Sequence, residues 1–79
     1  MATLLLFGPA RRAAGQRSVA IDAASVAELL EEACRRFGPE FEQVLRTSAV
    51  WVNGDTAAGD PAIGEHDEVA VLPPVSGGG

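Results

Sequence analysis

The hydrophobic pattern at the start of the chain predicts two strands. Thr3–Phe7 is apolar on both faces, so it either lies centrally in a sheet or has one face against a partner. Arg17–Ile21 alternates, with Val19 and Ile21 on one face. The segment between them, GPARRAAGQ, opens with Gly-Pro and closes near a further glycine. We therefore predict a turn there, which joins the two strands in a hairpin.

The clearest element is a helix in the segment from Ser25 to Pro39. Ser25 and Glu28 have the spacing of a capping box, in which each side chain accepts a hydrogen bond from an otherwise unpaired backbone N–H. Gly38 and Pro39 are residues that end helices. The apolar residues recur at helical spacing and form one stripe: Val26, Leu29, Leu30, Ala33 and Phe37.

The second half of the chain predicts a short turn of helix and further strands. Pro39–Arg46 is the short helical turn. Ala49–Asp55 is a strand that ends in Asn-Gly, the strongest short hairpin signal, so a short strand can follow it. After a loop in which Ile63 is expected to be buried, Asp67–Leu72 forms the last strand, again apolar on both faces.

This order of elements predicts an α+β domain over residues 1–72, followed by an extended tail over 73–79. The first and last strands are both apolar on both faces, so we expect them to pair in parallel in the middle of the sheet. A mixed sheet packed on one main helix in this order is the β-grasp, or ubiquitin-like, fold. The alternative, a small ferredoxin-like fold, requires a second full helix.

Composition and charge limit the function. The 79 residues suffice for one small domain, and 47% hydrophobic with 22% charged residues is typical of a soluble protein. The net charge of −5 argues against binding to nucleic acid. No apolar run is long enough for a membrane span or signal peptide, so we expect a cytoplasmic protein. All six basic residues are arginines, so no lysine amine is present to accept an isopeptide bond.

The side chains offer little chemistry of their own. Cys34 and His66 are single and distant in the sequence, which makes a metal site or a catalytic pair a weak hypothesis, and we expect no bound metal. Cys34 lies at the edge of the helical stripe and is expected to pack there. Trp51 is expected to be a core or sheet-face anchor. We find no plausible nucleophile and base among the side chains.

The C-terminal LPPVSGGG is the best candidate for chemistry. Prolines cannot donate to a sheet, so they project the chain away from the fold, and glycines make its end thin enough to enter a narrow tunnel. A frayed end or a linker is the simpler alternative. If the end is reactive, its carboxylate needs activation, most simply as a mixed anhydride with AMP. A sulfur nucleophile can then displace AMP and leave a thiocarboxylate.

The stretch VNGD…GDPAIGEHDEVAVLPPVSGG resembles the C-terminal half of the small subunits of molybdopterin synthase, the MoaD family of ubiquitin-like sulfur carriers. The N-terminal LLLFGPARRAAG is similar to the first strand of that family. The specific part of the resemblance is Asp67–Gly78. His66 stands where the family usually has glycine.

The resemblance implies a β-grasp fold and a mechanism that depends on partners. An E1-like adenylating enzyme of the MoeB type would use ATP to adenylate the terminal glycine, and a sulfur donor would convert it to a thiocarboxylate. The tail would then enter a large subunit of the MoaE type, in an expected heterotetramer, and pass sulfur to precursor Z to form the dithiolene of molybdopterin. The chain itself would bind no cofactor and would have no catalytic side chains.

The same resemblance implies roles for particular residues. Phe7 and Leu72 would belong to the docking face, on the side of the sheet without the helix. The family ends in two glycines whereas this chain has three, so the reactive end is either Gly79 or Gly78. A shift of one residue would misplace the acyl group by about 3.5 Å. The residues that would lie in the partner's tunnel are Pro73, Pro74, Val75, Ser76 and Gly77.

Two other functions remain open at this point. One is a related β-grasp sulfur carrier for thiamine or cysteine biosynthesis, although the thiamine carriers are usually shorter and lack the double proline. The other is a ubiquitin-like protein modifier. The absence of lysine excludes chains of this protein linked through its own lysines, but not its conjugation to other proteins.

Overall fold

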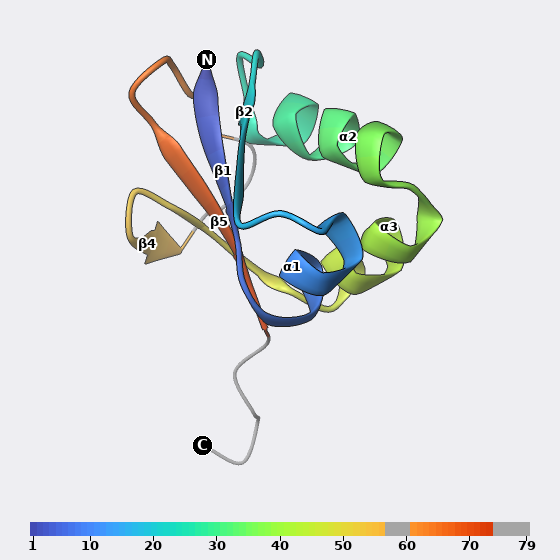
Figure 1. The fold of residues 1–79 in the computed structure, drawn as a ribbon. Helices are drawn as coiled ribbons and strands as arrows, with labels where there is room; N and C mark the ends of the chain where they lie inside the picture. Colours follow the sequence, from blue (N-terminus) through green and yellow to red (C-terminus); the bar gives the residue numbers. More distant parts are fainter. Residues whose placement is uncertain (57–60, 74–79) are drawn as a thin grey trace.

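The computed structural model describes residues 1–56 and 61–73, which form one mixed sheet and three helices (Figure 1). The sheet order is β2-β1-β5-β3-β4, and β1 and β5 pair in parallel at its centre, with Leu4 opposite Val69. The predicted β-grasp fold is therefore confirmed, including the central pair. The elements are β1 (Ala2–Leu6), α1 (Gly8–Ala14), β2 (Ser18–Ile21), α2 (Val26–Phe37), α3 (Pro39–Arg46), β3 (Ala49–Val52), β4 (Asp55–Thr56) and β5 (Glu68–Leu72).

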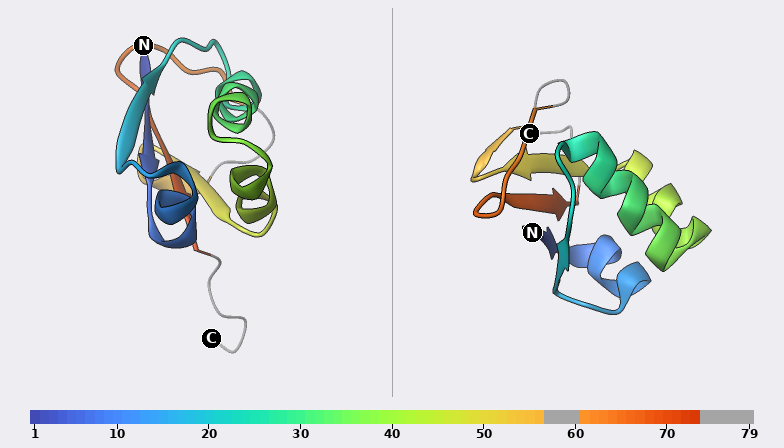
Figure 2. Two further views of the ribbon diagram at one scale, coloured as in Figure 1. Left: turned by 45° about the vertical axis from the view of Figure 1, so that its right-hand side comes forward. Right: turned by 90° about the horizontal axis from the view of Figure 1, so that it is seen from above.

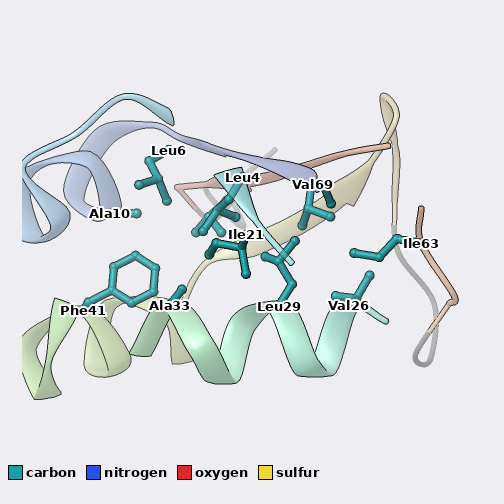
Figure 3. Packing of buried hydrophobic residues seen from close by; sticks show 12 residues of the cluster. Leu4, Leu6, Ala10, Ile21, Val26, Leu29, Ala33, Phe41, Ile63 and Val69 are labelled. Atoms are coloured by element: carbon teal, nitrogen blue, oxygen red, sulfur yellow. The ribbon is translucent and has the colours of Figure 1, made fainter. Parts of the chain in front are cut away.

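The three helices lie on the same side of the sheet, and the core fills the space between them (Figures 2 and 3). Inward-facing strand residues such as Leu4 and Val69 are fully buried there against Leu29 of α2 and Phe41 of α3. Ile63 is also buried, as predicted, and extends the core beside Val26 (Figure 3). In the described part of the chain, the opposite side of the sheet carries no helix (Figure 2).

The main helix begins as its capping residues predict. The Ser25 side chain accepts a hydrogen bond from the Glu28 amide at 3.3 Å. The Glu28 carboxylate accepts one from the Ala24 amide at 2.9 Å, one residue before the expected partner. Both interactions satisfy amides near the helix start that have no partner within the helix.

The prediction of a turn between the first two strands is wrong, because Gly8–Ala14 is a helix, α1. Pro9 suits the start of a helix, since the amide it lacks would be unpaired there, and Gly15 ends the helix in the left-handed conformation at φ 73°. Ala10 is buried against the core. The short helical segment predicted at Pro39–Arg46 is confirmed as the eight-residue helix α3, which buries Phe41 completely.

The predicted Asn-Gly hairpin is confirmed between β3 and β4, and it is tied to the start of β5. Asn53 and Gly54 both have positive φ, as such a tight turn requires. The Asn53 side chain donates to Asp67 Oδ1 at 3.0 Å and accepts from the Glu68 amide at 2.9 Å. The other oxygen of Asp67 accepts from the Gly64 amide at 2.7 Å. These bonds from Asn53 and Gly64 lower the pKa of Asp67.

Replacing Asp67 should make the free energy of unfolding less dependent on pH in the acidic range. Because its pKa is lower in the folded state, the carboxylate stabilises the fold above its usual pKa of 3.8, and this contribution disappears as the pH falls further. Asn at this position keeps only one acceptor oxygen for two donors. We expect D67N to be less stable than the unchanged protein at pH 7, with a difference that narrows below pH 3.8. Urea unfolding across this pH range measures the effect.

The exposed carboxylate of Glu65, two residues away in the same loop, provides the control. E65Q removes the same charge from the same loop, and it should be as stable as the unchanged protein at pH 7. If D67N and E65Q give parallel curves, the hydrogen bonds of Asp67 contribute nothing specific to stability.

Candidate functional site

The side of the sheet without helices carries a set of apolar side chains, which we call the open face. Two register pairs place Leu5 and Trp51 on either side of Ala70. Two residues further along β5, on the same face, Leu72 pairs with Ala49 and begins the outer row of this face. The Phe7 amide donates to the Val71 carbonyl at 3.1 Å, which continues the parallel ladder one residue beyond β1 and sets Phe7 beside Leu72. The open face consists of Leu5, Phe7, Ala49, Trp51, Ala70 and Leu72.

The open face is partly exposed and does not contribute to the core. Phe7 and Trp51 keep 44% and 37% of their surface exposed, and Leu72 is half-buried. None of these side chains packs with the buried cluster under the helices. Contiguous apolar surface on a small protein marks a site for another molecule, usually a protein. The arrangement therefore suits docking.

The structure places Phe7 and Leu72, the two residues expected at a docking face, next to each other, and it places Trp51 on the same face. Phe7 and Leu72 both lie on the open face, as adjacent members of its outer row. Trp51 was expected to be a core or sheet-face anchor; it lies on the sheet face, on the uncovered side. The alternation of AVWV indicates this placement of Trp51. Val50 and Val52 face the core, so the residue between them faces the other side of the sheet.

The chain leaves the sheet beside the start of α1. β5 ends at Leu72, and the exposed Pro73 follows it. Gly8 has φ +58°, and a Cβ added there would lie 3.0 Å from Pro73 Cγ, which is closer than an ordinary carbon contact. The tail thus begins next to Phe7, at one end of the open face. The remaining predicted tail residues lie outside the described part of the chain: Pro74, Val75, Ser76, Gly77, Gly78 and Gly79.

Replacing Gly8 with alanine should destabilise the domain by about 2 kcal/mol, since it adds left-handed strain and a contact with the Pro73 ring. Gly15 has a similar φ of +73° but nothing within 4 Å of an added Cβ. G15A should therefore cost only about 1 kcal/mol. Urea unfolding of both variants measures the difference. If both variants lose the same free energy of unfolding, the Pro73 ring moves away from a side chain at position 8 without a cost in stability.

The described side chains provide little reactive chemistry. Cys34 is half-buried and packs at the edge of the core as predicted; burial, followed by the nearby Glu42, raises the pKa of its thiol. The thiol is thus mostly protonated and unreactive at neutral pH. Within residues 1–56 and 61–73, no three side chains of His, Cys, Asp or Glu are placed to hold a metal ion. Among the helices described, none has the length and apolar character needed to cross a membrane.

A β-grasp domain with an uncovered apolar sheet face, whose chain end leaves the central strand beside that face, has the architecture of a ubiquitin-like carrier protein. The family comparison agrees, since the model of the ThiS family matches residues 4–78. The chain belongs to the ThiS family, the ubiquitin-like sulfur carriers of the ThiS and MoaD type.

Solved structures with the same fold cover nearly the whole chain. The small archaeal modifier protein SAMP1 from Haloferax volcanii is 31% identical, with a TM-score of 0.81 over 96% of this chain and 97% of that one. A putative molybdopterin converting factor, subunit 1, from Pyrococcus furiosus is 26% identical, with a TM-score of 0.82 over 94% and 97%. Subunit 1 of the molybdopterin-converting factor of Helicobacter pylori, solved in complex with subunit 2, shares the fold at 22% identity, with a TM-score of 0.70 over 96% of each chain.

Proposed function

We propose that this chain is the sulfur-carrying small subunit of a molybdopterin synthase and works in the cytoplasm. The observation that carries the proposal is the family match through residue 78, which includes the ending DEVAVLPPVSGG. The similarity to a putative molybdopterin converting factor subunit supports this pathway among those that such carriers serve.

The proposed chemistry takes place at the C-terminal carboxylate, with catalytic groups from partner enzymes. An E1-like adenylating enzyme of the MoeB type joins the carboxylate to the α-phosphate of ATP and releases pyrophosphate. A sulfur nucleophile from a donor protein then attacks the acyl carbon, and AMP leaves. When this nucleophile is the outer sulfur of a donor persulfide, the product is an acyl disulfide that still holds the donor. A thiol then attacks the donor's sulfur and forms a disulfide with it, which releases the terminus as a thiocarboxylate; this thiocarboxylate supplies sulfur to precursor Z in a MoaE-type large subunit.

The domain contributes binding and positioning in this scheme. The open face supplies apolar area for docking, and the tail starts at its edge, beside Phe7. Docking therefore sets the distance between the body and the partner's active site, which a narrow tail then spans. Two small subunits on a dimer of large subunits would form the heterotetramer.

Mass spectrometry of the intact protein tests the proposal. Incubation with the adenylating enzyme encoded in the same genome, ATP and a sulfur source should raise the mass by about 16 Da, as one oxygen is replaced by sulfur. The product should bind the MoaE-type subunit and convert precursor Z. Without a thiocarboxylate the proposal fails; a thiocarboxylate that does not bind this subunit would instead indicate a carrier for thiamine or cysteine biosynthesis.

A second candidate is a ubiquitin-like protein modifier, favoured by the 31% identity to SAMP1. In that case, incubation in a lysate with ATP should attach the chain to lysines of other proteins through its C-terminal carboxylate. Isopeptide-linked peptides after digestion would identify such products. Because this chain contains no lysine, every isopeptide bond of this kind must lie on another protein.

A further inference from the structure

A hollow of about 360 Å³ lies between β1, β2 and the beginning of α1, and it adjoins the open face. Leu5 and Phe7 belong to both. The Leu6 amide donates to the Arg17 carbonyl at 2.8 Å, which holds the segment before β2 against β1. We call this region the arginine hollow; its lining is Leu5, Leu6, Phe7, Arg11, Arg17 and Ser18.

The arginine hollow is positively charged although the protein is acidic. Arg11 and Arg17 are exposed and form no ion pair within residues 1–56 and 61–73, whereas the arginines of α2 and α3 do. Among the described residues, no carboxylate lines the hollow. Each of three other hollows on the described surface is lined by at least one carboxylate. These are Glu31 and Glu42 in the first, Asp22 and Glu65 in the second, and Glu40 beside Arg12 in the third.

We propose that the arginine hollow receives carboxylate side chains of the adenylating enzyme when that enzyme covers the open face. The identity of this partner rests on the function proposed above. Guanidinium groups suit this role because they bind carboxylates in a fixed two-pronged geometry and remain charged at every physiological pH. The partner surface would be apolar where it meets Phe7 and acidic at the rim that meets Arg11 and Arg17.

The charge distribution explains why such a contact would set the orientation of docking. The chain carries a net charge of −5, so most of its surface repels an acidic partner. An acidic rim is attracted at the arginine hollow, which lies beside the start of the tail. Rim charges act mainly on the rate and specificity of association. The hollow would therefore favour the one approach that presents the tail to the active site.

Charge reversal tests the proposal, with Arg12 as the matched control. Arg12 is exposed on the same helix, but it lines a different hollow, together with Glu40. We expect R11E and R17E each to weaken binding to the adenylating enzyme of the same genome about tenfold at ~50 mM salt, chiefly through slower association. R12E should change the affinity less than about threefold, and the variants should converge at ~0.5 M salt because exposed charges are screened there.

Cross-linking tests the carboxylates directly, because the chain has no lysine. R11K introduces a single ε-amine into the hollow, and R12K introduces one into the neighbouring hollow as a control. A carbodiimide joins an amine to a carboxylate without a spacer. R11K should therefore form a cross-link to Asp or Glu of the adenylating enzyme, located by peptide mass spectrometry, and R12K should not.

The outcomes separate this proposal from the proposed function. Equal affinities of R11E and R12E, or equal cross-linking of R11K and R12K, would overturn the proposal while thiocarboxylate formation by the unchanged protein upholds the function. If R11E binds as well as R12E but is adenylated more slowly, the arginines act on a phosphate of ATP, which also overturns it. If the unchanged protein neither binds the enzyme nor gains sulfur, both proposals fail.

Discussion

Deletion of Gly78 and Gly79 should reduce sulfur transfer by at least about 100-fold while the melting temperature stays within about 1 °C. The reactive carboxylate would then end one residue short of its position in the partner if Gly78 is the reactive end, and two residues short if Gly79 is. Stability should be unchanged because, among the described residues, the buried core runs from Ala2 to Val71 and draws on the sheet and the helices. Thiocarboxylate formation by intact mass and differential scanning calorimetry measure the two effects.

Deletion of Gly79 alone tests which glycine is the reactive end. The family match ends at residue 78, so we expect this variant to be at least as active as the unchanged chain. A 100-fold loss in this variant as well would identify Gly79 as the reactive end, since a shift of about 3.5 Å suffices to misplace the acyl group. A large fall in melting temperature in either variant would contradict both predictions, because the tail would then be structural.

Replacing Phe7 and Trp51 with alanine should abolish measurable docking and leave the fold intact. Aromatic side chains at the centre of an interface typically contribute about 2–4 kcal/mol each, so F7A and W51A should each weaken binding by about 30-fold or more. Neither side chain packs with the core, so the free energy of unfolding should change by less than about 1 kcal/mol. Isothermal titration calorimetry with the adenylating enzyme and urea unfolding measure these quantities.

Leu45 on α3 provides the matched control for the open face. It is half-buried, as Leu72 is, but it packs against the core on the helical side. L45A should therefore lose about 1–3 kcal/mol of stability and keep its affinity for the partner. If F7A and W51A bind normally while L45A does not, the partner docks on the helices and the open face has another role.

Much of the fold could be predicted because the strongest signals are local. The two strands that are apolar on both faces, Thr3–Phe7 and Asp67–Leu72, identified the central parallel pair. Ser25 and Glu28 located the start of α2, and Asn53-Gly54 located the hairpin. Each of these features depends on side-chain alternation or backbone preference within a few residues, which the order of amino acids specifies directly.

The helix α1 was missed because local preference alone does not determine it. A seven-residue helix is marginal in isolation, and Gly8-Pro9 is equally compatible with a turn. Packing of Ala10 into the core stabilises the helix, and only the folded chain provides that contact. The signal that favours the helix, proline at the start and glycine after the end, became decisive only with that packing.

By itself, the sequence determined the faces of the strands, the absence of lysine and the expectation that any chemistry belongs to the C-terminal carboxylate. Only the tertiary structure decided which residues from distant segments meet: Trp51 with Leu5 across Ala70, Gly8 with Pro73, and Arg11 with Arg17 beside Phe7. The physical reason is that alternation and chain ends are properties of neighbouring residues, whereas these contacts depend on strand order, register and helix packing.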